Sequence, residues 1–427
     1  MTHSVERLRE DLASDRWRAG ELCLRLLGAV LQVLATWALT RALAPEDAGI
    51  YFRGFVIALG LSTLLRGKYE IHMARHIIGQ GATSTGLATG ALLRQLARYF
   101  LLRSGVLSAI LLVVTADLDI QAPQLQTVLQ TYLPFVLAIP CVGLTGFLGE
   151  ALRAANRTLG IVISTFTTNL AILLAVVLAP KGAPLALYSW AFLLGGMAAT
   201  GVAMALARRH FPARMEDSTR SPSLIEFKSV DALEFIGVAR GSQLWGPLCI
   251  LSVLASPLQM AQYAVAARTA LIVDFFLPAL NLADDGPIRA SSVRSTSQRR
   301  LFRALATSLF YSSALVVPLM VSAPATLALY GSPYNANLAV YPLLLGVQWV
   351  NGLGRPAVRT AAATWDLRRI GMVIGSGAVA SVLVCSLGIA RYGAVAAAAG
   401  SLIGALVLNG GAILVAYGSR AVTRQTK

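Results

Sequence analysis

The chain has 427 residues, of which 56% are apolar and 13% charged, and its mean hydropathy is +0.66. Soluble domains carry about 25% charged residues, so this composition excludes an ordinary soluble enzyme or binding domain. The net charge of +16 could indicate a nucleic-acid partner, but the basic residues lie between apolar segments.

The apolar residues fall into repeated blocks, each long enough to cross the roughly 30 Å hydrocarbon core of a bilayer as a helix. They predict an all-α polytopic membrane protein with twelve transmembrane helices. The expected spans are 20–40, 48–66, 96–116, 128–149, 159–179, 184–207, 233–254, 260–283, 303–329, 338–356, 370–390 and 394–417.

The basic residues follow every second loop of this topology. If the N-terminus is cytoplasmic, 27 basic residues lie on the cytoplasmic side and three, Arg41, Lys181 and Arg391, on the other. This asymmetry is typical of the positive-inside rule. We therefore expect both termini in the cytoplasm, and we expect no nucleic-acid partner.

Residues 1–18 precede the first span and are expected to form an amphipathic cytoplasmic helix at the membrane surface. The apolar run that follows is about 20 residues long, whereas the apolar region of a signal peptide has about 7–15. The four cysteines lie in apolar spans without CxxC spacing, so no disulfide framework or zinc site is expected. His72 and His76 are spaced as a helical pair but lack a neighbouring ligand, so no metal is expected either.

A weak internal repeat divides the chain. A shift of about 211 residues aligns Gly160–Ile163 with Gly371–Ile374. The repeat predicts two six-helix lobes related by a pseudo-two-fold axis along the membrane normal; chance similarity of two helix bundles is the alternative. The expected N-lobe is 19–207, the cytoplasmic linker 208–232 and the C-lobe 233–427.

Six arginines lie at membrane depth, where each would cost about 2.5–3.5 kcal/mol at a helix centre. Two of them, near the cytoplasmic end of the third span, can reach the headgroups. The other four occur in pairs 28 residues apart in corresponding spans of the two halves. The two near the headgroups are Arg98 and Arg103. The four that occur in pairs are Arg25, Arg53, Arg240 and Arg268.

These four arginines predict a cationic cleft between the lobes. Arg25 and Arg240 are expected in the inner half of the bilayer, and Arg53 and Arg268 in the outer half. A guanidinium matches phosphate oxygens with a planar fork, so the pattern favours a phosphate or pyrophosphate ligand. The alternative is that each arginine pairs with a carboxylate or a backbone carbonyl for packing alone.

Three further residues complete the predicted site. Gln243 follows Arg240 on the seventh span and is a candidate substrate contact. Pro247 interrupts the same span and is a candidate hinge, with a static kink as the alternative. Asp274 is a carboxylate within the eighth span and a candidate ion-coupling site.

Two stretches resemble a known family. They resemble the joins between the first two spans of each lobe in Wzx-type polysaccharide-unit flippases. The stretches are RALAPEDAGIYFRGF, Arg41 to Phe55, and LASPLQMAQYAVAARTALIVDFFLPAL, Leu254 to Leu280. These flippases belong to the MOP superfamily, which also contains the MATE exporters and the MurJ lipid II flippases. The resemblance implies a MATE/MOP-like fold with a cationic cavity, to which Arg25, Arg53 and Arg268 correspond by position.

The resemblance also implies a function. The chain is similar to flippases that turn undecaprenyl-pyrophosphate-linked O-antigen or exopolysaccharide units to the outer leaflet of the bacterial inner membrane. A flippase is not an enzyme and needs no cofactor, although coupling to protons or sodium and association with a polysaccharide polymerase are left open. The alternatives are a MATE-like cation-coupled multidrug exporter, a major-facilitator carrier and a non-transporting scaffold. A MATE exporter uses a carboxylate in the first helix of a lobe, where this chain has Glu21 at the edge and Arg25 deeper.

Overall fold

The computed structural model describes residues 2–80, 86–121, 125–155, 157–179, 182–211, 230–280, 298–335, 338–364 and 367–425. Nearly all of these residues are helical. The helices are α1 (Thr2–Ala42), α2 (Pro45–Gln80), α3 (Gly86–Gln121), α4 (Leu125–Ala155), α5 (Arg157–Leu178), α6 (Leu185–His210), α7 (Val230–Leu254), α8 (Pro257–Ala270), α9 (Ile272–Leu280), α10 (Gln298–Val321), α11 (Ala323–Ala328), α12 (Ser332–Asn335), α13 (Val340–Thr364), α14 (Leu367–Tyr392) and α15 (Ala394–Gln425).

Eight segments of the described chain are long and apolar enough to cross a membrane, so the chain is a multi-pass membrane protein. The helices expected at 96–116, 159–179, 233–254 and 338–356 form but are not among the eight. The count of twelve spans stays a prediction. The eight segments are Leu22–Ala42, Pro45–Gly67, Thr131–Arg153, Leu185–His210, Pro257–Leu277, Leu301–Val321, Gly371–Tyr392 and Ala394–Tyr417.

Three element boundaries differ from the sequence expectation. α1 is one helix from Thr2, so no break separates residues 1–18 from the first span. The eighth span is divided at Leu271 into α8 and α9. The ninth span ends at Val321, because Pro324 in the first turn of α11 has no N–H with which to continue the ladder of α10.

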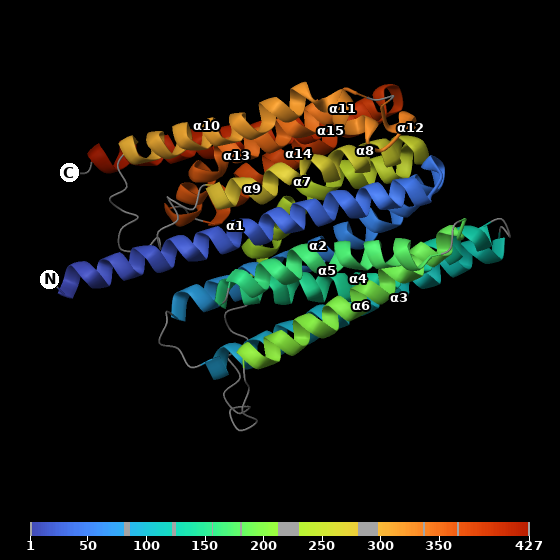
Figure 1. Ribbon diagram of the computed structural model, residues 1–427, viewed down its shortest axis with the longest axis horizontal. Coiled ribbons are helices and arrows are strands. Elements are labelled where there is room, and N and C mark those ends of the chain that lie inside the picture. The colour runs from blue at the N-terminus through green and yellow to red at the C-terminus, as the bar shows by residue number, and fades with distance from the viewer. Residues whose placement is uncertain are drawn as a thin grey trace.

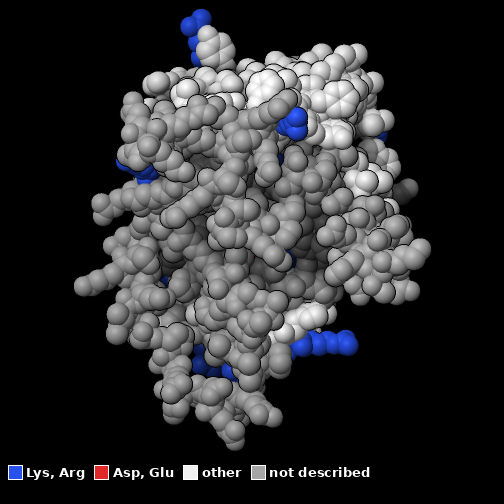
Figure 2. All heavy atoms as spheres, turned by 90° about the vertical axis from the view of Figure 1, so that its left-hand side faces the viewer, with Lys and Arg blue, Asp and Glu red and all other residues white. Residues whose placement is uncertain are grey.

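The helices run along one common direction (Figure 1). The start of α1 and the end of α15 lie at the same end of the molecule, and the α1–α2 turn lies at the opposite end with α11 and α12. Figure 2 looks onto the end that holds both chain termini. The charged side chains visible there among the described residues are basic, and no acidic one is visible.

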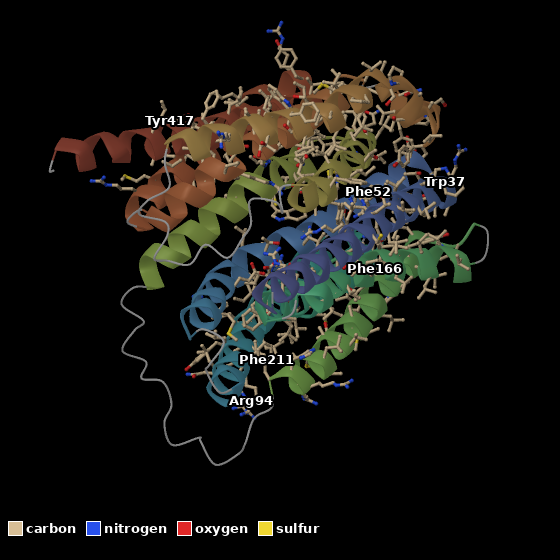
Figure 3. All side chains as sticks on the ribbon, turned by 60° about the vertical axis from the view of Figure 1, so that its left-hand side comes forward. Trp37, Phe52, Arg94, Phe166, Phe211 and Tyr417 are labelled. Carbon is tan, nitrogen blue, oxygen red and sulfur yellow. The ribbon has the colours of Figure 1, made fainter. Side chains whose placement is uncertain are left out.

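Two sets of helices share a core at only one end. The largest cluster of buried apolar side chains includes Phe52 of α2 and Tyr263 of α8, so it joins α1–α6 to α7–α15. A second cluster, with Phe211, lies within α2–α6 and the residue after α6, and a third, against which Tyr417 packs, lies within α10, α13 and α15. Figure 3 shows Phe211 and Tyr417 well apart, with Phe52 nearer the α1–α2 turn. The two sets are therefore packed together toward the α1–α2 turn and have separate cores toward the chain termini.

The outside of the bundle is apolar. Side chains such as Leu102, Val177, Leu194, Leu387 and Leu414 are more than half exposed. In a bilayer these side chains face acyl chains, where exposure of apolar surface carries no hydrophobic cost.

Candidate functional site

Arg268 of α8 is buried where the two sets of helices meet, and only 9% of its surface is exposed. Its Nε donates to Thr36 Oγ1 on α1 and its Nη2 donates to Asn169 Oδ1 on α5, each at 2.7 Å. Its guanidinium carbon lies 4.9 Å from the centre of the Phe55 ring on α2, a cation–π distance. One arginine of the second set thus contacts three helices of the first.

The backbone of Arg268 is held from the same side. Arg268 lies in the last turn of α8, where carbonyl groups lack partners within the helix. Gln32 of α1 supplies one, because its Nε2 donates to the Arg268 carbonyl at 2.6 Å. Thr36 in turn donates its hydroxyl to the Gln32 carbonyl at 2.8 Å. Gln32 and Thr36 are therefore part of one hydrogen-bonded network that fixes both the main chain and the side chain of Arg268.

The partners of the Arg268 charge are neutral. In the part of the chain that the structure describes, no carboxylate forms an ion pair with Arg268, although the phenols of Tyr51 and Tyr330 are close enough to interact with it electrostatically. Hydrogen bonds from a charged group contribute about 1.5–3 kcal/mol each, so two of them and the Phe55 ring offset much of the several kcal/mol that burial of an ion costs. A guanidinium has five N–H groups, and two donate to described residues. The arrangement can therefore accept an anion.

Arg53 of α2 joins the two sets of helices at a second point. Its Nη2 donates to the carbonyl of Ala255, in the turn between α7 and α8, and it also hydrogen-bonds the Tyr132 hydroxyl on α4. Its Nε is buried with no hydrogen-bond partner among the described residues. Nearby, a Cβ added at Gly49 would overlap the carbonyl oxygen of Pro257, so α2 and α8 approach this closely only because residue 49 is glycine.

Arg25 lies on the same stripe of α1 as the partners of Arg268. It precedes Gln32 by seven residues and Thr36 by eleven, and both spacings return to one face of a helix with 3.6 residues per turn. Arg25 is half-buried. From Arg25 to Thr36 the rise is about 16 Å, so this stripe carries cationic and polar groups across about half of the hydrocarbon core.

The remaining predicted residues of this site lie on α7. Gln243 is half-buried, and the side chain of Arg240 lies outside the described residues. Pro247 is buried inside α7, which continues through it, and its carbonyl accepts a 3.7 Å contact from the Cys385 thiol. The structure thus brings Arg53 and Arg268 to the contact between the two sets of helices. A single cavity lined by all four arginines stays a prediction, as does the hinge at Pro247.

Asp274 forms an ion pair inside the second set of helices. Its carboxylate on α9 contacts the Nη2 of Arg355 on α13, with side-chain exposures of 44% and 23%. A second polar contact lies on the same face of α13, where Asn409 of α15 donates to Asn351 at 3.0 Å. A candidate ion-coupling carboxylate therefore already has a cationic partner in this conformation. The described residues contain no group of three or more His, Cys, Asp or Glu that could hold a metal.

Sequence reasoning missed the partners of Arg268 and Asp274. Asn169, Gln32 and Thr36 are uncharged and stood out little in apolar spans, although the four-residue spacing of Gln32 and Thr36 was a usable signal for one helix face. Arg355 lies at the end of the expected tenth span, and nothing in its position indicates the ion pair with Asp274.

Comparison with known proteins shows the fold. No protein-family model and no curated protein sequence matches the chain. Its structure is similar to an inward-facing conformation of a multidrug resistance MATE family transporter of the MOP superfamily, with a TM-score of 0.64, 14% identity and coverage of 95% of this chain and 99% of that one. It is also similar to the lipid II flippase MurJ in an inward closed conformation, with a TM-score of 0.64, 11% identity and coverage of 93% and 87%. A mutant of the Vibrio cholerae MATE transporter VcmN gives a TM-score of 0.61 at 14% identity, with 98% of both chains covered.

Proposed function

We propose that this protein is a flippase that moves an undecaprenyl-pyrophosphate-linked oligosaccharide unit from the cytoplasmic to the outer leaflet. Its fold is that of the MATE and MurJ structures. The observation that carries the proposal is the buried Arg268, a permanent charge at the contact between two sets of helices whose described partners are all neutral. A charge kept at such a position without a carboxylate is expected to serve an anionic ligand.

The depth of Arg268 suits such a ligand. Arg268 follows Pro257, the first residue of α8, by eleven residues, a rise of about 16 Å or about half of the hydrocarbon core. Transporters of this general architecture bind their substrates near the bilayer midplane between repeats. A pyrophosphate crossing the membrane needs cationic donors most at this depth, because it is farthest from water there.

In the mechanism that we propose, Arg25, Arg240 and Gln243 first bind the pyrophosphate while the polyprenyl tail stays in lipid. The lobes then rock about Pro247, and the anion passes to Arg268 and Arg53. Attraction between guanidinium and phosphate offsets part of the dehydration cost of the anion. The successive sites must be matched in affinity, since one very tight site would trap the lipid.

The two-lobe arrangement is supported by recurring helix pairs. α4 packs on α6 and α13 packs on α15; α1 packs on α5 and α7 packs on α14; α3 packs on α4 and α10 packs on α13. Each pair in the second set is the counterpart of a pair in the first under the shift of about 211 residues. The shared core toward the α1–α2 turn and the separate cores toward the termini suit a bundle that opens at the terminal end.

The setting and the driving force are also proposals. We place the protein in the bacterial inner membrane with both termini cytoplasmic, where a polysaccharide polymerase on the opposite side could receive the product. Coupling to protons or sodium would involve Asp274, whose release from Arg355 on protonation or cation binding would change the charge balance within the second set of helices.

The proposal is tested by reconstituting the protein in vesicles with a fluorescent undecaprenyl-pyrophosphate-linked sugar and measuring how fast the label becomes accessible across the bilayer. The wild-type protein is expected to flip the lipid, and Arg268→Gln is expected to abolish flipping. Arg391→Gln is the matched control, because Arg391 is an exposed arginine at the end of α14 that lies over the ring of its neighbour Tyr392. Undiminished flipping by Arg268→Gln would refute the proposal.

A MATE-like multidrug exporter is the second candidate, favoured by the number of MATE structures with a similar fold. It predicts transport of a lipophilic cation driven by a proton or sodium gradient. Export of such a cation by vesicles that do not flip the pyrophosphate-linked lipid would favour this candidate.

A further inference from the structure

Both hydrogen bonds that the Arg268 guanidinium donates within the described part of the chain end on the first set of helices. Nε reaches the Thr36 hydroxyl on α1, and Nη2 reaches the Asn169 amide oxygen on α5. Both acceptors are themselves buried, with 1% and 7% of their surface exposed. The Arg268 side chain therefore fastens α8 to two helices of the other set at once.

The neutral character of these acceptors makes the fastening reversible. A carboxylate in either position would form a charge-assisted bond about twice as strong as a neutral one, and separating the helices would then leave two unpaired charges. A hydroxyl and an amide hold the guanidinium less firmly. A phosphate oxygen carries negative charge and fits the guanidinium fork, so it is the stronger competitor for the same N–H groups.

The hydrogen bond of Gln32 does not compete with an anion for the Arg268 guanidinium. Its amide donates to the Arg268 main-chain carbonyl and not to the guanidinium, so an anion bound to the side chain leaves this bond in place. α1 and α8 can thus stay adjacent at Gln32 while the side-chain contacts to Thr36 and Asn169 are exchanged.

From these contacts we infer that Thr36 and Asn169 are positioning residues that hold Arg268 in the substrate-free, closed conformation, and that a pyrophosphate group replaces them as acceptor. The inference rests on the proposed function and assigns it two residues that the arginine pattern alone does not identify. When the anion takes the guanidinium, the side-chain bonds from Arg268 to α1 and α5 are lost. The α1–α2 end then keeps fewer bonds between the two sets, among them that of Arg53 to the Ala255 carbonyl, and its opening requires less free energy.

The test measures this opening directly, by the distance between two spin labels. Ala44 follows α1 and Ser332 begins α12; both are exposed and belong to different sets of helices at the α1–α2 end. Each is replaced by cysteine in full-length protein whose four native cysteines are alanine. The distance is recorded by electron paramagnetic resonance in phosphatidylcholine nanodiscs, during titrations with inorganic pyrophosphate and with farnesyl pyrophosphate. Nanodiscs with phosphatidylglycerol and no pyrophosphate test whether an ordinary lipid headgroup supplies the phosphate.

The variants change the acceptors of Arg268 in opposite directions. Asn169→Asp supplies a carboxylate and is expected to raise the pyrophosphate concentration at half-opening about tenfold, whereas Asn169→Ala and Thr36→Val are expected to lower it about threefold. Adding Arg268→Gln to Asn169→Asp should remove both the retention and the response to pyrophosphate, because both act through the Arg268 guanidinium. Thr200→Val is the matched control, since Thr200 is also a buried threonine and its hydroxyl bonds Thr145 and Cys141 within the first set.

The outcomes separate this inference from the proposed function. Opposite shifts by Asn169→Asp and Asn169→Ala support the inference, even where the reconstituted protein does not flip the polyprenyl-linked sugar and the proposed function fails. Shifts in the same direction, or none, overturn the inference, even where flipping is intact and depends on Arg268. Opening by phosphatidylglycerol alone, sensitive to Asn169→Asp, supports the exchange but assigns the phosphate to bulk lipid.

Discussion

The Nε of Arg268 on α8 donates a 2.7 Å hydrogen bond to the Oγ1 of Thr36 on α1, 232 positions earlier in the chain. With its second hydrogen bond, to Asn169 on α5, the buried Arg268 side chain joins the two sets of helices. The join is where substitutions should separate an effect on transport from an effect on folding.

Arg268→Lys tests whether the fork of the guanidinium matters beyond its charge. An ammonium is a compact point charge and cannot donate to Thr36 and Asn169 with the fixed geometry of Nε and Nη2. We expect flipping at low lipid concentration to fall about tenfold, which corresponds to about 1.4 kcal/mol, while the protein still folds. The rate in vesicles and the thermal midpoint in detergent check this, and a lysine variant with the wild-type rate would contradict it.

Gly49→Ala tests the closest approach of the two sets. A methyl group at residue 49 would overlap the Pro257 carbonyl, so α2 and α8 must separate or strain, at a cost of about 1–3 kcal/mol. We expect a lower thermal midpoint and a spin-label distance shifted toward the open form. Gly201→Ala is the control, because a Cβ there meets nothing within 4 Å and alanine is favoured over glycine inside a helix by about 0.5–1 kcal/mol. Equal midpoints for the two variants would show that the contact is loose.

Asp274→Asn and Arg355→Gln test the ion pair between α9 and α13. Because Asp274 is 44% exposed, we expect each single variant to lose about 1 kcal/mol and the double variant to lose less than the sum. A double-mutant cycle of thermal stability measures this coupling. If Asp274 also couples transport to an ion gradient, Asp274→Asn retains pyrophosphate binding but loses the response of the flipping rate to an imposed pH or sodium gradient. Additive stability losses would show that the pair does not contribute to stability.

Tyr334, on the short helix α12 outside the spans, provides a pH test of the closed end. Burial, with the nearby Glu46 carboxylate, raises the pKa of Tyr334 to about 12, from the ordinary 10.0. The phenol ionises more easily in the unfolded chain, so its contribution to stability is complete below pH 10 and is lost as the pH rises toward about 12. We expect the thermal midpoint of the wild type to fall more steeply over this range than that of Tyr334→Phe. Parallel curves would place the pKa of Tyr334 near that of an exposed tyrosine.

Much of the fold follows from the apolar pattern, because each span must satisfy its backbone polar groups within a helix. The positions of α2, α4, α6, α14 and α15 agree with the expected spans. The breaks at Leu271 and after Val321 do not follow from hydropathy, since apolar residues continue through both positions and the helix ends depend on local hydrogen bonding.

The candidate site was predictable only in part. Arg53 and Arg268 stand out because a charge at membrane depth is costly, and the structure brings both to the contact between the sets of helices. Asn169 could not be assigned, because its contact with Arg268 depends on where α5 and α8 lie in the folded bundle, which no local pattern encodes. The pairing of Arg355 with Asp274 could not be predicted either, because the two residues lie 81 positions apart and no local pattern links them.

α1 runs without interruption for 41 residues, a length of about 60 Å and roughly twice the hydrocarbon thickness. Thr36, whose hydroxyl accepts the hydrogen bond from Arg268 Nε, therefore lies on the same uninterrupted helix as Thr2. A tilt of a few degrees where α1 leaves its partners on α8 would move the N-terminal end of α1 sideways by several ångströms. A change in the contacts of Arg268 would thus be transmitted to the end of the molecule that holds both chain termini (Figure 1).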